Sequence, residues 1–115
     1  MKWVWAALLM LTACGGGGDF GTCGNDAAKQ SAGAAVIKNR CTMCHSSKLA
    51  GAARQAAPSG VNFDTQAGIL DNGSAGFQSI KLGTMPRGLG ALTAAEIEDV
   101  REFLACGAVS TSTSG

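Results

Sequence analysis

The stretch Cys41-Thr42-Met43-Cys44-His45 places two thiols and an imidazole within five consecutive residues. The chain contains no other histidine. Cysteines and histidines are rare in this composition, so the chance of meeting the pattern at random is on the order of one in several hundred. A spacing of this kind is typical of redox and metal sites.

The composition is that of one small domain. The chain has 115 residues, a formal net charge of +1, seventeen glycines and no tyrosine. The near-neutral charge gives no electrostatic reason to expect nucleic acid or an anionic membrane surface as a partner. Because few large side chains are available for a core, a chain of this size normally needs a disulfide, a metal or a cofactor to hold it together.

Cys-x-x-Cys-His is the attachment signature of c-type haem, and its spacing has a physical reason. Two thiols add across the two vinyl groups of the haem, and the histidine that follows is placed under the iron as the proximal ligand. We therefore expect Cys41 and Cys44 to form the two thioethers of one covalently bound haem c. His45 is expected to ligate its iron.

Two other kinds of site also use closely spaced cysteines. A structural zinc site needs four ligands, commonly from two such pairs, and the remaining cysteines do not form a second close pair. A thioredoxin-like dithiol follows a strand in a βαβ setting, and no alternating strand pattern occurs in this sequence. A non-haem thiol–disulfide oxidoreductase that uses Cys41 and Cys44 is therefore the less favoured alternative.

The methionines narrow the choice of a sixth iron ligand. Met1 and Met10 lie in the expected export signal at the N-terminus, and Met43 is tied to the proximal side by the motif itself. Met85 is left, in a loop-like stretch directly before a proline, which favours an extended backbone. We expect Met85 to be the distal ligand, because thioether ligation opposite histidine fills the coordination sphere and raises the reduction potential. An ordinary buried methionine is the alternative.

The N-terminal residues have the pattern of an export signal. A short positive start is followed by an apolar run over residues 3–13, which is too short to span a bilayer as a helix. The run ends in LTAC, residues 11–14, which resembles the lipobox of bacterial lipoproteins. That resemblance implies lipidation of Cys14 on the periplasmic side of a bacterial membrane, and Gly15 after it favours the outer membrane. The alternatives are a plain signal peptide and a buried helix that happens to end in cysteine.

The remaining sequence predicts an all-α domain. The apolar spacing predicts a first helix capped at Asn25 or Asp26 and running through Arg40, short helices over residues 64–70 and 75–82, and a last helix capped at Thr93 and ending near Gly107. The last helix has the clearest signal, because Thr93 and Glu96 form a capping box. Residues 46–62 are expected to form a loop.

These features resemble a small monohaem cytochrome c with an N-terminal attachment site and a distal methionine. The resemblance covers about residues 26–107 and rests on the CTMCH motif, on Met85-Pro86 and on the flanking helices. It implies an electron carrier rather than an enzyme, with redox proteins as partners, and it leaves the oligomeric state open. A haem enzyme or gas sensor with a labile Met85 is the alternative from another class.

The family's terminal helices cross at a close contact, which implies specific partners in this chain. Gly33 and Ile37 match the contact in the first helix, where a residue without a Cβ lets two backbones approach. The matching positions in the last helix are Val100, Phe103 and Leu104. The family also uses a proline carbonyl to accept the second ring N–H of the proximal histidine, and Pro58 is the candidate.

Cys23 and Cys106 flank the two helices that cross in the family. An exported protein enters an oxidising compartment, so we expect a disulfide between these cysteines, with two free thiols as the alternative. The expected organisation is a signal peptide over residues 1–13, a lipid anchor and glycine-rich tether over 14–24, a cytochrome c domain over 25–107 and a flexible tail over 108–115.

Overall fold

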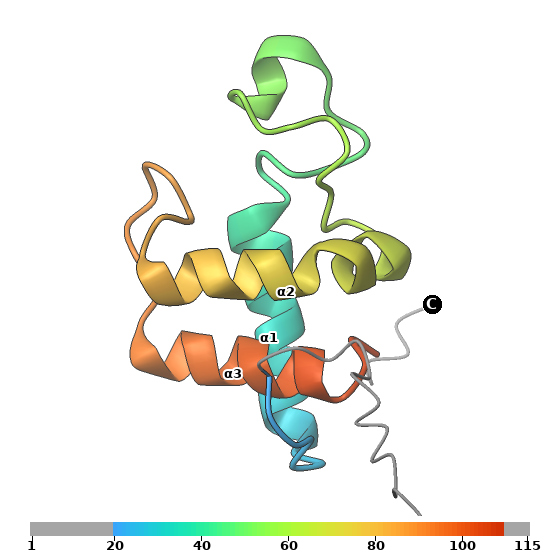
Figure 1. Ribbon diagram of the computed structural model, residues 1–115, viewed down its shortest axis with the longest axis vertical. Coiled ribbons are helices and arrows are strands. Elements are labelled where there is room, and N and C mark those ends of the chain that lie inside the picture. Colours follow the sequence, from blue (N-terminus) through green and yellow to red (C-terminus); the bar gives the residue numbers. More distant parts are fainter. Residues whose placement is uncertain (1–19, 110–115) are drawn as a thin grey trace, which may run out of the picture.

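The computed structural model describes residues 20–109, which form three α-helices linked by a long loop and two short helical turns (Figure 1). The elements are α1 (Ala27–Val36), the π-turn η1 (Ile37–Cys41), the 3-10 turn η2 (Gly51–Arg54), α2 (Gln66–Leu82) and α3 (Ala94–Ala105). The described residues contain no strand. The predicted all-α fold class is confirmed.

The first helix begins where its cap predicts and changes its geometry near the motif. The Asp26 side chain accepts a hydrogen bond of 3.1 Å from the Lys29 backbone N–H, which satisfies one of the free donors of the first turn. The α-helical part is shorter than predicted and ends at Val36. The next turn is a π-turn, closed by a 3.3 Å bond from the N–H of Thr42 to the carbonyl of Ile37. Helical backbone therefore leads directly into the first cysteine of the motif.

Helices α1 and α3 cross at Gly33, as the resemblance implies. Figure 1 shows the two helices at a steep angle to each other. A Cβ on Gly33 would collide with the backbone carbonyl of Asp99 and would lie 2.8 Å from the Cβ of Phe103. Val100, on the same part of α3, is completely buried. The glycine therefore permits an approach of two backbones that no other residue allows.

Helix α2 is a single helix, and the prediction of two short helices was wrong. Gly73, which lies in the predicted break, and Gly76 are contact points instead. A Cβ on Gly73 would lie 3.2 Å from the Leu104 side chain, and one on Gly76 would lie 2.9 Å from the Phe63 ring. Tertiary packing of this kind outweighs the low helix propensity of glycine, so the helix continues through both positions.

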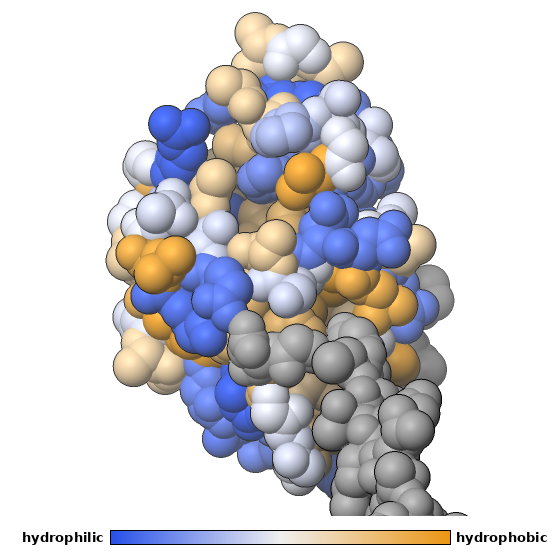
Figure 2. Space-filling view, viewed as in Figure 1, coloured by the Kyte–Doolittle hydropathy of each residue, from blue (hydrophilic) through white to orange (hydrophobic). Residues whose placement is uncertain are grey.

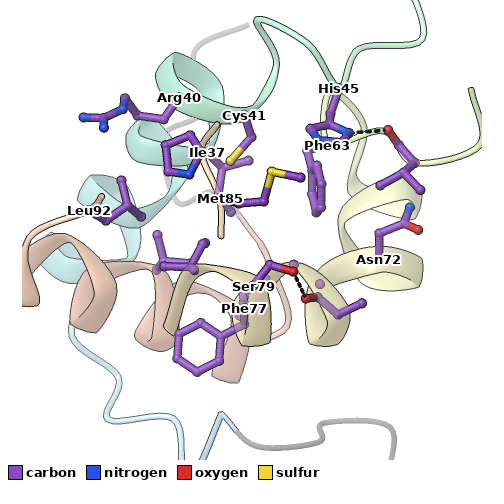
Figure 3. A pocket seen from close by; sticks show the side chains of 18 residues that line it. Ile37, Arg40, Cys41, His45, Phe63, Asn72, Phe77, Ser79, Met85 and Leu92 are labelled. Atoms are coloured by element: carbon purple, nitrogen blue, oxygen red, sulfur yellow. Dashed lines mark hydrogen bonds between the residues drawn. The ribbon is translucent and has the colours of Figure 1, made fainter. Parts of the chain in front are cut away.

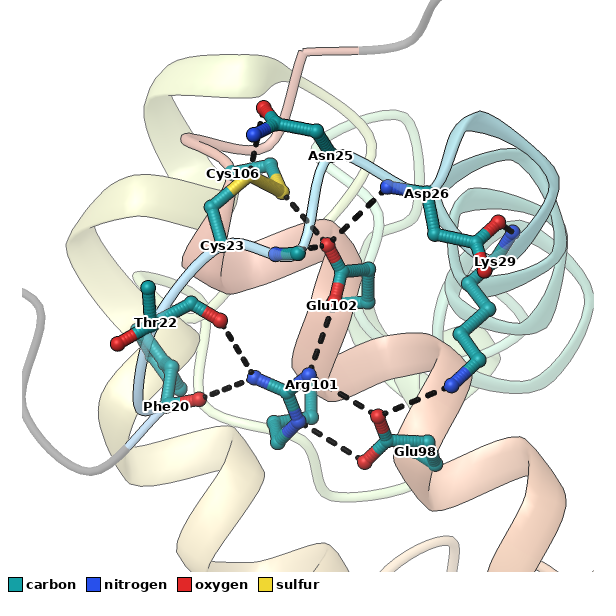
Figure 4. Close-up of polar contacts among 11 residues, drawn as sticks. Phe20, Thr22, Cys23, Asn25, Asp26, Lys29, Glu98, Arg101, Glu102 and Cys106 are labelled. Atoms are coloured by element: carbon teal, nitrogen blue, oxygen red, sulfur yellow. Dashed lines mark hydrogen bonds and ion pairs between the residues drawn. A yellow bond between two sulfur atoms is a disulfide. The ribbon is translucent and has the colours of Figure 1, made fainter.

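The N-terminal strap, defined here as residues 20–26, packs against α3 (Figure 4). The Phe20 ring is buried and meets the Phe77 ring edge-on, with 5.5 Å between the ring centroids. The Arg101 guanidinium donates a hydrogen bond of 2.7 Å to the carbonyl of Phe20. The strap is thus held both by its apolar side chain and by its backbone.

The folded domain is therefore longer than the predicted 25–107. Phe20 was assigned to the tether and Ala108 to the tail, yet both are buried in the core. Phe20 stands alone beside Gly21, and Ala108 and Val109 are only two apolar residues before a polar stretch, so neither buried residue belongs to a periodic pattern that would mark it as core.

A disulfide joins Cys23 in the strap to Cys106 at the end of α3, with 4.8 Å between their Cα atoms. Beside it lies Glu102, which is only 2 % exposed. Its carboxylate accepts hydrogen bonds from the backbone N–H of Gly24 at 2.6 Å and from Arg101 at 2.9 Å. The buried charge is therefore paired and hydrogen-bonded, which is the condition for tolerating it inside a protein.

The surface is mixed rather than dominated by one apolar face. Figure 2 shows that strongly hydrophobic residues form separate small patches between hydrophilic ones on the visible side. Within residues 20–109, no helix has both the length and the apolar character that a membrane crossing requires. The predicted signal over residues 3–13 and the predicted lipidation site Cys14 lie outside the described residues.

Candidate functional site

An apolar cleft lies between η1, α2 and the loop that leads into α3. It encloses about 830 Å³ of space, counting its open mouth. Most of its wall is made of buried hydrophobic side chains, among them Ile37, Phe77, Ile80, Leu92, Val100 and Leu104. Cys41, His45 and Met85 also line it, and Figure 3 shows these three side chains around the same space.

The motif folds into a tight turn at the end of η1. The backbone N–H of His45 donates to the carbonyl of Cys41 at 2.8 Å, and that of Cys44 donates to the same carbonyl at 3.2 Å. Cys44 lines a second hollow, which shares Cys41, His45 and Met85 with the main cleft. Met43 is 53 % exposed and is a wall residue of neither hollow. The turn therefore gathers the two thiols and the imidazole and leaves the intervening methionine outside.

The Cys41 thiol faces an apolar environment. Burial raises its pKa to about 11, against a smaller opposite effect from the positive charge of Arg40. Cysteines that carry out thiol–disulfide exchange normally have a lowered pKa, because the thiolate is the reacting form. Cys41 is therefore poorly suited to the thiol–disulfide exchange that a non-haem oxidoreductase would require of it.

The His45 ring is held by a backbone carbonyl, but not by the predicted one. Its Nδ1 lies 3.0 Å from the carbonyl oxygen of Val61, and since a carbonyl only accepts, Nδ1 carries the proton. The opposite nitrogen, Nε2, is then the basic one. The carbonyl of Pro58 instead accepts from Arg54 at 2.7 Å. The Pro58 prediction was wrong because the loop folds around Arg54, which brings the carbonyl three residues further along to the imidazole.

Met85 comes from a loop that is tied down at both ends. Its backbone N–H donates to the carbonyl of Ser79 at 3.3 Å, near the end of α2. Further along the loop, Arg40 donates to the carbonyls of Leu89 at 3.0 Å and Gly90 at 2.8 Å. In Figure 3 the Met85 side chain extends into the cleft toward Cys41 and Phe63. Two anchors therefore fix the loop that carries the thioether.

Comparison with known protein families decides what this cleft is. A family model described as cytochrome c matches residues 30–106, a stretch that contains the motif, the cleft and most of both crossing helices. The chain belongs to the cytochrome c family. Comparisons with curated proteins and with solved structures found no match. Like its family, this cytochrome c carries a covalently attached c-type haem and is a haem-based electron-transfer protein.

The residues of the cleft fit such a group. A haem needs a flat apolar pocket, two thiols at its edge and a histidine with an oriented ring. The cytochrome's cleft has hydrophobic walls, both motif cysteines border its hollows as free thiols, and the carbonyl of Val61 orients His45. In residues 20–109, the one other cluster of possible metal ligands is Cys23, Glu102 and Cys106, and both of its sulfurs belong to the disulfide.

Three residues of the cytochrome's site had no signal in the sequence. Arg40 and Arg54 look like ordinary solvated cations, and Val61 contributes only its backbone. Arg40 donates to the carbonyl of Gly90, fifty residues later in the chain. The carbonyl of Val61 accepts from both His45 and Arg54, and its position depends on how the loop folds. The position of Arg40 directly before Cys41 is the one sequence feature that could have drawn attention to it.

Proposed function

We propose that this cytochrome c is a one-electron carrier with a histidine–methionine ligand pair. Cys41 and Cys44 hold the haem through thioethers, and His45 and Met85 ligate its iron. The supporting observation is that Cys41, His45 and Met85, from two segments forty residues apart in sequence, line one hydrophobic cleft. When bound, the haem supplies a reversible couple between ferric and ferrous iron.

The protein's own contribution is to hold the ligands still. The bond from Nδ1 to the carbonyl of Val61 fixes the plane of the His45 ring and increases the basicity of Nε2. The anchors at Ser79 and Arg40 hold the loop of Met85 against the rest of the domain. Because both ligands come from anchored segments, little structure has to rearrange when the charge of the site changes.

The test is the absorption spectrum of the haem-loaded protein and of two methionine variants. We expect covalent haem in the wild type, Met85→Ala and Met43→Ala. The weak far-red band of methionine–iron ligation in the ferric protein is expected to vanish only in Met85→Ala. Met43→Ala is the matched control because Met43 is exposed and borders neither hollow.

Two other outcomes would change the proposal. A Met85→Ala spectrum identical to that of the wild type would remove Met85 from the ligand set. A wild-type protein that lacks the band and binds carbon monoxide at neutral pH would favour the enzyme or gas sensor with an open iron site.

We also propose that the protein is exported and held at the periplasmic side of a bacterial membrane, with the outer membrane favoured, by a lipid on Cys14. The support is the LTAC sequence after a short apolar run, together with a disulfide of the kind that persists in oxidising compartments. Cys14→Ser should move the holoprotein from the membrane fraction to the soluble fraction. Retention of the variant in the membrane fraction would contradict the proposal.

A further inference from the structure

Arg54 is a cation buried at the centre of the loop that follows the motif. It is only 5 % exposed. Its five N–H groups donate to six neutral oxygens, with one N–H of Nη2 shared between two acceptors: the carbonyls of Ser46, Leu49, Ala57, Pro58 and Val61 and the side-chain oxygen of Asn62. The loop is thus folded around one positive charge.

This charge has no carboxylate partner. The ion pairs among residues 20–109 involve Lys29, Arg40 and Arg101 but not Arg54. Asp64, later in the same stretch of chain, is partly exposed, and its carboxylate accepts hydrogen bonds from Ser47 instead. A guanidinium cannot lose its proton in a protein, so the loop retains a net positive charge in its interior. Burying an uncompensated charge is costly, and a neutral side chain could also donate hydrogen bonds to carbonyls.

The charge lies two hydrogen bonds from the imidazole of His45. The carbonyl oxygen of Val61 accepts from Nδ1 of His45 at 3.0 Å and from Nη2 of Arg54 at 3.2 Å. One acceptor therefore serves both the orienting bond of the histidine and the buried cation. The second donor draws electron density from the oxygen, which makes it a weaker acceptor for the ring N–H.

We propose that Arg54 is a positioning residue that raises the reduction potential of this cytochrome c. The proposal rests on His45 being an iron ligand. Two effects act in the same direction. A fixed positive charge beside the site disfavours the ferric state, which has one more positive charge than the ferrous state. The weakened bond to Val61 also lowers the basicity of the imidazole, and a less basic ligand stabilises ferric iron less.

Three variants of the haem-loaded protein separate charge from structure. Arg54→Gln removes the charge, and Arg54→Lys keeps it while losing the planar set of donors. Asn62→Asp keeps Arg54 and instead places a carboxylate oxygen at the position that is now 2.9 Å from Nη2. Lys48→Gln is the control, because it removes one charge from an exposed residue of the same loop, where water screens it.

The midpoint potential is measured by spectroelectrochemistry after the spectrum has shown the same low-spin ligand set in every variant. We expect Arg54→Gln and Asn62→Asp to favour the ferric form by about tenfold, which corresponds to a fall of about 59 mV for a one-electron couple. Arg54→Lys and Lys48→Gln should stay close to the wild type. Asn62→Asp keeps the test available if Arg54→Gln does not accumulate as a folded holoprotein.

The variants distinguish an effect of the charge from an effect on the loop structure. Equal shifts in Arg54→Gln and Arg54→Lys, or a shift in Arg54→Gln no larger than that in Lys48→Gln, would show that Arg54 is only a structural centre of the loop. An unchanged potential in Asn62→Asp would overturn the charge effect in the same way. Absence of the histidine–methionine spectrum in the wild-type holoprotein would instead contradict the proposed ligand pair. This spectrum is recorded before any potential is measured.

Discussion

The carboxylate of Glu102 accepts a hydrogen bond of 2.6 Å from the backbone N–H of Gly24, a residue 78 positions earlier in the chain. The bond crosses from the last helix to the N-terminal strap, and the adjacent Arg101 supports it from the other oxygen. The strap has no helical or sheet partner for its backbone, so Glu102 supplies what regular secondary structure would otherwise provide. Together with the bonds from Arg101 to the carbonyls of Phe20 and Thr22, this contact ties the strap to α3.

Replacing Glu102 should therefore destabilise the fold. In Glu102→Ala the N–H of Gly24 and the guanidinium of Arg101 lose a charged acceptor, and a hydrogen bond to a charged group contributes about 1.5–3 kcal/mol. The measurement is the free energy of unfolding of the holoprotein in denaturant at neutral pH. Asp71→Ala is the control, since it also removes one carboxylate but from an exposed position on α2. Equal losses in the two variants would contradict the role given to Glu102.

The helix crossing gives a second prediction. Gly33→Ala places a methyl group against the carbonyl of Asp99, so the two helices must move apart. Overpacking of this kind typically costs about 1–3 kcal/mol, which should appear as a lower midpoint of thermal unfolding. Gly60→Ala is the matched control, because nothing lies within 4 Å of the added carbon there. A Gly33→Ala protein as stable as Gly60→Ala would mean that the crossing is not tight.

The acid stability of the domain should depend on Glu98. A hydrogen bond from Arg101, opposed by a smaller desolvation effect and helped by Lys29, lowers the pKa of Glu98 to about 2. Because the folded pKa lies below the unfolded one of about 4.3, the stabilisation is present above that value and is lost as the pH falls toward 2. The free energy of unfolding should therefore drop less between pH 6 and pH 3 in Glu98→Gln than in the wild type. A parallel drop in both proteins would contradict this assignment.

Arg40 should control how often the loop of Met85 opens. In Arg40→Ala the carbonyls of Leu89 and Gly90 lose their hydrogen bonds to the guanidinium. Losing about 1.4 kcal/mol of such bonding shifts the opening equilibrium about tenfold. The check is binding of imidazole or carbon monoxide to the holoprotein, which should be about tenfold more favourable in Arg40→Ala. Lys38→Ala, two residues earlier, is the control. An equal increase in ligand binding in that variant would contradict a specific role of Arg40 in holding the loop of Met85.

The disulfide should contribute substantially to stability. Cys23 and Cys106 close a loop with a sequence separation of 83, and removing a crosslink over such a distance typically costs about 2–4 kcal/mol. The paired variant Cys23→Ser/Cys106→Ser should unfold at lower denaturant than the wild type. Reductant should lower the midpoint of the wild type and leave that of the variant unchanged. Equal midpoints without reductant would show that the bridge adds nothing.

Local chemistry made part of this molecule predictable. The capping box of Thr93 and Glu96 is present, with bonds of 3.0 and 3.1 Å, because all its atoms lie within one helical turn. The position of the haem-attachment residues could be predicted because the CTMCH motif carries two thiols and the imidazole in one turn. Gly33 could be placed at the crossing only through the resemblance to cytochromes c, since a mid-helix glycine has no specific meaning by itself.

The features that sequence reasoning missed all depend on contacts between distant residues. Gly73 suggests a helix break until the Leu104 side chain is known to lie against it. The proline chosen as acceptor for His45 is in the right loop, but the position of each carbonyl depends on how the loop wraps a buried side chain. No local pattern distinguishes a buried arginine from a solvated one, because the distinction lies in the surrounding fold.

The bridge between Cys23 and Cys106 also determines how mechanical force would travel through the domain. Tension applied to the chain before Cys23 passes through the disulfide directly into the end of α3. Helix α1, helix α2 and the residues that line the cleft lie within the covalent loop and do not bear that tension. A pull on the strap would therefore reach α3 without being transmitted through the motif or the loop that carries Met85.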